Sequence, residues 1–159
     1  MEEQKDFNMT YELAGTGSGE MKIIQSGTTQ YRMSFSYISD ALGDMLKATN
    51  EIMDGAKNSK FWLCEEPGQY VWLLNAEKQD EIDIEIYWLD DWLGYNPNEW
   101  VKANGKKVFS IKVDKSIFFK SVIEICKTLL NLHGLDGYKK LWVEYPFPEK
   151  LYKSLQSKI

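Results

Sequence analysis

The feature that most constrains the fold is a strict alternation of acidic residues and isoleucines over residues 81–86. Successive side chains of a β-strand point to opposite faces, so a strand here has one acidic face and one β-branched apolar face. A helix would scatter the isoleucines around its circumference and leave no apolar side to bury. The alternation therefore predicts a strand of an antiparallel sheet that is covered on one face and hydrated on the other.

Shorter apolar alternations, separated by turns that contain glycine, proline or asparagine, indicate further strands. These predicted strands lie at residues 9–14, 20–26, 30–37, 61–64, 70–74 and 106–113. Apolar residues recur at helical spacing in four other segments, at 39–54, 116–132, 135–145 and 148–157. Residues 1–8 are polar and predict a flexible tail, and residues 93–105 predict a loop with a short turn of helix within it.

Strands in uninterrupted runs, with helices between or after the runs, favour the α+β class over a doubly wound parallel sheet. We therefore expect a single antiparallel, twisted sheet of about six to seven strands. Two main helices, at 39–54 and 116–132, are expected to pack on one face of this sheet, followed by short C-terminal helices. A chain of 159 residues is long enough to bury a core without metals or disulfides, so we expect one domain over residues 1–159.

The net charge of −5 conceals an uneven distribution along the chain. Residues 1–100 contain 7 basic and 19 acidic side chains, whereas residues 101–159 contain 12 basic and 5 acidic ones. The two halves either attract each other or present faces to different partners. The basic half carries lysines and no arginine, since the only arginine is Arg32, and this does not favour nucleic-acid binding. The start of the chain lacks the apolar region of an export signal, and no apolar run reaches the roughly 18 residues of a membrane span, so we expect a cytoplasmic protein.

Few residues have the spacing that catalysis or metal binding requires. His133 is the only histidine, and it follows a predicted helix without a serine or cysteine nearby in the sequence. Cys64 and Cys126 both lie in core-like segments, and we expect no disulfide between them. The glycine-rich segment 15–19 lacks the lysine and hydroxyl of a phosphate-binding loop, and it joins two predicted strands as a hairpin loop.

The carboxylates of the strand at 81–86 do not predict a metal site either. Side chains on the same face of a strand stand roughly 7 Å apart along the chain, which is too far to chelate one ion together. We therefore predict no catalytic residue, no cofactor and no metal, and we expect a protein that is not an enzyme. The acidic face is then either neutralised by lysines of a neighbouring strand, such as Lys106 and Lys112, or offered to a basic partner.

Between residues 77 and 100 there are eight acidic residues, one base and five tryptophans or tyrosines. Acidic side chains steer the approach of a basic protein, and large rigid aromatic groups provide contact area. Core packing is the competing explanation for Trp72 and Trp88. For Trp92 and Trp100, the choice between core packing and partner binding stays open. The predicted partner-binding residues are Glu81, Asp83, Glu85, Tyr87, Asp90, Asp91, Trp92 and Tyr95.

Four segments together resemble the immunity proteins that accompany bacterial polymorphic toxins. These are residues 35–42 at the entry to the first helix, the turn 65–68 with 70–72 after it, the acidic strand at 81–85, and the ending 142–148. The resemblance implies a non-catalytic protein that binds and blocks a basic toxin domain, such as a nuclease, and such families share no active residues to carry over. The alternative is a small-ligand-binding or regulatory α+β module, with an aromatic-lined pocket under its helices.

Overall fold

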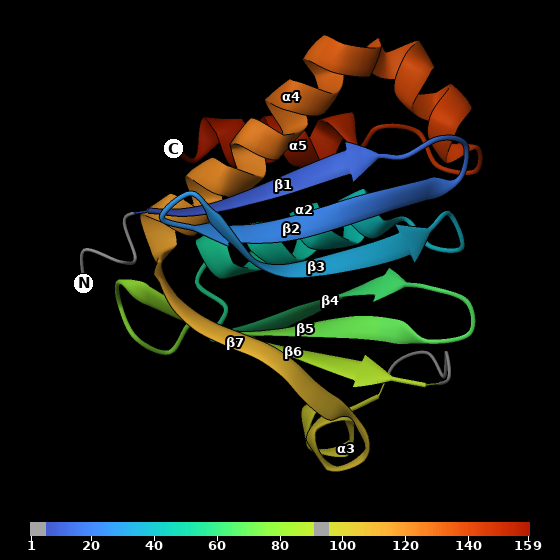
Figure 1. Cartoon of the computed structure of the whole chain (residues 1–159). Coiled ribbons are helices and arrows are strands. Elements are labelled where there is room, and N and C mark those ends of the chain that lie inside the picture. The colour runs from blue at the N-terminus through green and yellow to red at the C-terminus, as the bar shows by residue number, and fades with distance from the viewer. Residues whose placement is uncertain (1–5, 91–95) are drawn as a thin grey trace.

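The computed structural model describes residues 6–90 and 96–159 and divides seven strands between two antiparallel sheets (Figure 1). The first sheet has the order β1-β2-β3 and consists of β1 (Phe7–Leu13), β2 (Ser18–Gln25) and β3 (Thr28–Ser36). The second has the order β4-β5-β6-β7 and consists of β4 (Asn58–Cys64), β5 (Gln69–Asn75), β6 (Glu81–Leu89) and β7 (Lys106–Asp114). Each sheet is a meander, because consecutive strands are neighbours in it.

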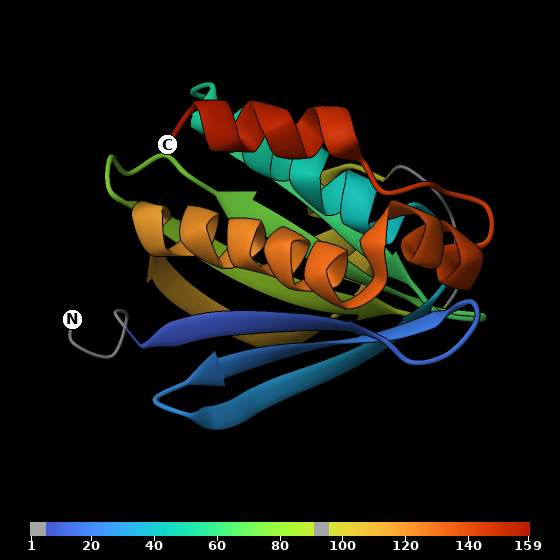
Figure 2. The same cartoon turned by 90° about the horizontal axis from the view of Figure 1, so that it is seen from above.

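Four helices are described: α2 (Ala41–Met53), α3 (Asn98–Asn104), α4 (Lys115–Trp142) and α5 (Glu149–Ser157). Figure 2 shows α2, α4 and α5 together on one side of the strands. The carboxylate of Asp40 caps α2 by accepting a hydrogen bond from the backbone of Gly43 at 3.1 Å. Helix α4 is interrupted at Gly134, whose φ of 69° is accessible to glycine at little cost. The break turns the end of α4 back towards the sheets.

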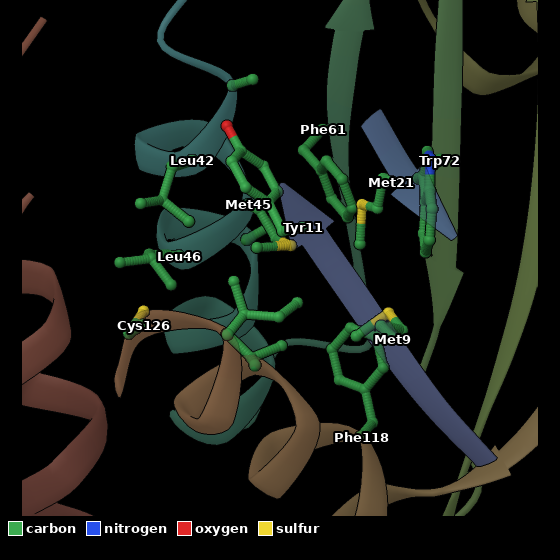
Figure 3. Packing of buried hydrophobic residues seen from close by; sticks show 14 of the residues in the cluster. Met9, Tyr11, Met21, Leu42, Met45, Leu46, Phe61, Trp72, Phe118 and Cys126 are labelled. Carbon is green, nitrogen blue, oxygen red and sulfur yellow. The ribbon is translucent and has the colours of Figure 1, made fainter. Parts of the chain in front are cut away.

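The main core fills the space between the two sheets and the helices α2, α4 and α5, because each of these elements turns an apolar face towards it (Figure 3). Fully buried side chains come from both sheets, such as Met21 and Trp72, and from the helices, such as Leu42 and Phe118. Burying one such side chain contributes about 1.5–3 kcal/mol. A core that draws on both sheets ties them into one packed unit.

A smaller apolar cluster lies on the opposite, outer face of the second sheet. It consists of Val71, Leu73, Tyr87, Leu89 and Val101, with Trp62 and Trp100 packed against it. Its cover is α3, which lies beyond β6 and β7 and away from the other helices (Figure 1). The outer face of β6 is therefore hydrated over only part of its length.

The α+β class and the antiparallel pairing are confirmed, but the expectation of a single sheet is wrong. The chain leaves β3 through α2, and β4 then starts a new sheet that forms no backbone ladder with β3, although the Ser36 hydroxyl donates a hydrogen bond to the Cys64 carbonyl of β4. Tyr31 of β3 stacks on Phe109 of β7, with ring centroids 5.7 Å apart, so the first sheet folds over the second instead of extending it. The alternation of residues within a strand shows which side chains share a face of the sheet. It does not show which strands lie next to each other, so it could not predict the division into two sheets.

Three smaller expectations can also be compared with the structure. Strand β1 begins at Phe7, which is buried, so Phe7 and Asn8 belong to the sheet and not to a tail. The short turn of helix expected within 93–105 is α3. Cys64 and Cys126 are both buried, and they form no disulfide, as expected.

Candidate partner-binding surface

The two faces of β6 follow the alternation seen in the sequence. Ile82, Ile84 and Ile86 point into the main core and are fully buried. Glu81, Asp83 and Glu85 lie on the outer face and are half-buried. The predicted strand and its apolar and acidic faces are confirmed.

Glu85 is held by two lysines from separate elements. Its Oε2 lies 2.8 Å from Nζ of Lys107 on β7, and its Oε1 lies 3.6 Å from Nζ of Lys102 on α3. The Tyr87 hydroxyl also donates a hydrogen bond to Oε2 of Glu85 at 3.4 Å. The hydrogen bond from Lys107, followed by the positive charge of both lysines, lowers the pKa of Glu85 against the opposing effect of burial. This carboxylate is thus part of an internal network that joins β6, β7 and α3.

The lysines that neutralise this face differ from those suggested by the sequence. The register of β6 against β7 shifts between Ile86 and Tyr87, and this β-bulge places Lys107 opposite Tyr87 and Lys106 opposite Trp88. A bulge exchanges which side chains of the strand point outward, so Lys107 reaches Glu85. Lys112 lies opposite Asp83 in the register, as the simple alternation requires. Glu81 is paired with Lys78, at 3.8 Å.

Helix α3 covers the end of the acidic face. The Lys60 ammonium of β4 donates hydrogen bonds to the carbonyl of Asn96 at 2.6 Å and to Oδ1 of Asn98 at 3.1 Å, which fixes the start of the helix on the sheet. Val101 and Trp100 then pack over Tyr87, which is only 5% exposed. Tyr87 is therefore a residue of the smaller apolar cluster, beside the acids and not exposed with them.

Four aromatic rings gather where β6 ends, and we refer to Tyr31, Tyr70, Trp88 and Phe109 as the aromatic cluster. Tyr70 contacts Trp88 with ring centroids 4.8 Å apart, and Tyr31 lies edge-on to Tyr70 at 6.3 Å and stacked on Phe109. All four rings are half-buried, so each keeps part of its surface in contact with solvent. Burial and the neighbouring Tyr70 raise the pKa of Tyr31 to about 12.

Carboxylates border the aromatic cluster. Trp88 Nε1 donates a hydrogen bond to Oδ1 of Asp90 at 2.9 Å. The Ser34 hydroxyl of β3 donates to Glu65 at the start of the turn between β4 and β5. Glu66, in the same turn, is exposed. Lys106 is the cross-strand neighbour of Trp88.

Gly68 allows Trp88 to pack where it does. A Cβ atom at position 68 would lie 2.2 Å from Cζ2 of Trp88 and 2.7 Å from the carbonyl oxygen of Leu89. Both distances are well below van der Waals contact, and the second neighbour is backbone, which cannot move aside alone. The turn before β5 therefore needs a glycine to hold the indole in the aromatic cluster.

The predicted binding residues divide into three groups. Glu81, Asp83, Glu85 and Tyr87 lie on the outer face of β6, where Glu85 and Tyr87 are engaged internally. Asp90 follows the strand and is exposed. Asp91, Trp92 and Tyr95 lie outside the described residues.

Sequence reasoning did not find Tyr31, Tyr70 and Phe109. They come from three strands of two sheets, and their meeting depends on how the first sheet folds over the second. Each looks like an ordinary core residue of its own strand, so no local pattern marks them. Trp72 is fully buried, as core packing predicts, whereas Trp88 is not.

The thiol of Cys126 is a buried structural group. Burial raises the pKa of the Cys126 thiol to about 12, so it is protonated at neutral pH.

In the described parts of the chain, no three histidine, cysteine, aspartate or glutamate residues are grouped so that they could hold a metal ion. None of the helices in those parts is long and apolar enough to cross a membrane. A groove of about 440 Å³ lies between β1 and α4, and the aromatic residue of its lining is Tyr11.

Comparisons of the chain with protein-family models, with curated proteins and with solved structures found no match.

Proposed function

We propose that this protein is a non-catalytic, cytoplasmic immunity-type protein that binds and neutralises a basic toxin domain. The observation that carries the proposal is the half-exposed aromatic cluster with Asp90, Glu65 and Glu66 around it. The resemblance of four segments to immunity proteins supports the same reading. The contact surface would be this end of the second sheet.

The composition of this surface suits a protein partner. Tyrosine and tryptophan offer large contact areas at low cost in conformational entropy, and they are enriched among residues that dominate binding energies. Here the rings are already positioned by contacts with one another, so little ordering is needed on binding. Exposed carboxylates at the border attract a basic protein and accelerate its approach.

The acidic face of β6 would then have two roles. Glu85 supports the surface from behind, because its ion pairs fix β7 and α3 on β6. Asp90 and Glu66 are exposed and would meet basic groups of the partner, and Asp90 also accepts the hydrogen bond of Trp88 Nε1. A variant of Glu85 should therefore act mainly on stability, and a variant of Asp90 mainly on binding.

The experiment begins with the gene next to this one. If it encodes a large secreted protein with a variable C-terminal domain, that domain is expressed with this chain and tested for co-purification and for loss of toxicity. The affinity is then measured for the double variant Asp90→Lys with Glu66→Lys, and for Tyr70→Ala. We expect each to weaken binding by about tenfold or more.

The matched control is Glu149→Lys with Glu144→Lys, which makes the same charge change at exposed positions near α5. It should leave the affinity within about twofold, because exposed charges away from an interface are screened by salt. Unchanged affinity of both site variants would contradict the proposed surface. Full toxicity in the presence of a bound, folded chain would contradict the neutralising function.

A further inference from the structure

A polar pocket of about 280 Å³ lies between helix α2 and strand β4, and we call it the α2–β4 pocket. Its helical wall is one face of α2, formed by Asp44, Lys47, Ala48 and Glu51. Its other wall is formed by residues 58–60 and Trp62 of β4. The volume is close to the lower limit of about 300 Å³ for small-molecule sites, which suits a ligand of few atoms.

The register of β4 shows that main-chain groups line this pocket. The Ala76 amide donates a hydrogen bond to the Lys57 carbonyl, and the Glu65 amide donates one to the Gly68 carbonyl, both at 2.8 Å. Alternate residues of an antiparallel strand bond to the same neighbour, so the odd-numbered residues of β4 bond to β5. The amide and carbonyl of Lys60 therefore point away from β5.

The pocket lies at this outward edge of β4. Ser59 and Lys60 are consecutive, so their side chains point to opposite faces of the strand, yet both residues line the pocket. Within residues 6–90 and 96–159, the outward amide and carbonyl of Lys60 have no hydrogen-bond partner. Helix α2 stands beside this edge, so the room that remains is that of a small molecule and not of a further strand.

Two opposite charges in the pocket are not paired with each other. Asp44 and Lys47 are three residues apart on α2, but they form no salt bridge, and in the described part of the chain neither side chain has a hydrogen bond. The remaining two charged groups of the lining are engaged. Glu51 accepts a hydrogen bond from the Ser59 hydroxyl at 2.8 Å, and the Lys60 ammonium bonds to residues 96 and 98.

Asp44 is the less hydrated of the two unpaired charges. Its side chain is half-buried, whereas Lys47 is exposed. Burial, followed by the negative charge of Asp40, raises the pKa of Asp44 to about 6, although the charge of Lys47 opposes this. A cation that reached the Asp44 carboxylate would therefore replace solvent that the fold has removed.

We infer that the α2–β4 pocket binds a small zwitterion of the α-amino acid type, whose ammonium and carboxylate groups lie close together. The ammonium would contact the Asp44 carboxylate and donate a hydrogen bond to the Lys60 carbonyl. The ligand carboxylate would contact the Lys47 ammonium and accept a hydrogen bond from the Lys60 amide. The pocket shares no residue with the aromatic cluster, so the inference does not rest on the proposed function.

The main-chain geometry favours an α-amino acid in particular. In an antiparallel ladder, the amide and carbonyl of one residue bond to the carbonyl and amide of a single opposite residue. A free amino acid carries its donor and its acceptor on the two sides of one Cα atom, as that opposite residue does. It can therefore occupy both outward groups of Lys60 without an extended chain.

Ligands with a single charge fit the pocket less well. The lining holds two carboxylates and two ammonium groups, so its formal charges cancel. A simple cation would be repelled by Lys47, and a simple anion would be repelled by Asp44 and Glu51. A zwitterion places one charge opposite each unpaired group.

The first test uses the unmodified chain. Each standard amino acid is added at millimolar concentration in a thermal-shift assay, and the affinity of the most stabilising one is measured by titration calorimetry. We expect at least one amino acid to bind. Its N-acetyl derivative, which lacks the ammonium, and the amine without its carboxylate should each bind at least about tenfold more weakly, because each loses a hydrogen bond to a charged group.

The second test uses variants of the two unpaired charges. Asp44→Asn and Lys47→Met should each weaken binding of the same amino acid by about tenfold or more. The matched controls are Asp136→Asn and Lys140→Met, which make the same changes at exposed positions near the end of α4. They should leave the affinity within about twofold, because distant exposed charges are screened by salt.

A third measurement locates the ligand on the chain. In nuclear magnetic resonance spectra of the unmodified chain, the amino acid should shift the Lys60 amide more than the amides of Lys57 and Phe61, which face β5. The inference is overturned if no amino acid binds, if the derivatives with one charge bind equally well, or if the shifted amides lie away from α2 and β4. Folded Asp44 and Lys47 variants that bind as well as the controls would also overturn it. If a variant does not fold, the derivatives and the amide shifts decide, since both are measured on the unmodified chain.

Discussion

The ion pairs of Glu85 give a stability prediction whose size follows from the structure. The substitution Glu85→Gln keeps the shape of the side chain but removes its charge, and with it the attraction to Lys107 at 2.8 Å and to Lys102 at 3.6 Å. A hydrogen bond to a charged group contributes about 1.5–3 kcal/mol when it is shielded from water. The Glu85 side chain is 29% exposed and the lysines about half, so solvent screening reduces the expected loss to about 1 kcal/mol.

The assay is urea unfolding followed by tryptophan fluorescence, at pH 7 and again at low pH. With a slope of about 2 kcal/mol per molar urea, a loss of about 1 kcal/mol lowers the midpoint by about 0.5 M. The folded-state pKa of Glu85 is lowered, so its contribution is present above the ordinary glutamate value and is lost as the pH falls through the lowered value. The original chain and Glu85→Gln should therefore differ at pH 7 and converge near pH 3.

The control is Glu81→Gln, whose single partner Lys78 lies at 3.8 Å and is mostly exposed. It should change the free energy of unfolding by less than about 0.5 kcal/mol. Equal effects of the two substitutions, or a Glu85→Gln effect that is the same at pH 7 and pH 3, would refute the internal role assigned to Glu85.

Three further predictions concern other parts of the chain. Gly68→Ala should destabilise the fold by about 1–3 kcal/mol and change the near-ultraviolet circular dichroism of Trp88, because the added Cβ overlaps the indole; an unchanged spectrum would contradict this packing. Asp44, whose pKa is raised by burial to about 6, binds a proton more tightly when folded, so stability should fall as the pH rises from 4 to 7. Asp44→Asn should flatten this pH dependence and stabilise the chain by about 1 kcal/mol at pH 7 after allowance for solvent screening, and an unaltered profile would count against it. Cys64 and Cys126 are buried thiols that form no disulfide, so neither should react with a thiol reagent until the chain unfolds, and rapid labelling of the native state would contradict this.

Features that repeat along one element were predictable from the sequence. The isoleucine face of β6, the helix α2 and the hairpin at 15–19 each depend on neighbours in the chain, and each was found within a few residues of its predicted place. Helix α4 covers most of the two predicted helices at 116–132 and 135–145, with a break at Gly134 between them. The exception at the N-terminus is instructive. Phe7 is a single apolar residue between polar neighbours, and Asn8 is polar, so no local pattern predicts a strand here. Their pairing with Gln25 and Ile24 of β2 makes them part of the strand.

Features that depend on how elements meet were not predictable. The division into two sheets, the bulge that selects Lys107 and the aromatic cluster all depend on pairings between segments distant in the sequence. A one-residue shift in register exchanges the faces of a strand, so the choice between Lys106 and Lys107 cannot be read from alternation alone.

Helix α3 explains why the acidic strand is not uniformly exposed. In a single sheet with helices on one face, the outer face of β6 would be open to solvent along its whole length, and Glu85 and Tyr87 would be surface groups. The chain instead returns from β6 through α3 before it pairs β7, and α3 folds back over that face. Its anchors are Lys60 at one end and the Glu85–Lys102 pair at the other. The cover leaves the end of β6 as the place where acidic and aromatic groups are exposed together, so a partner attracted by the charge of this strand would meet Asp90 and Trp88 before it met Glu85.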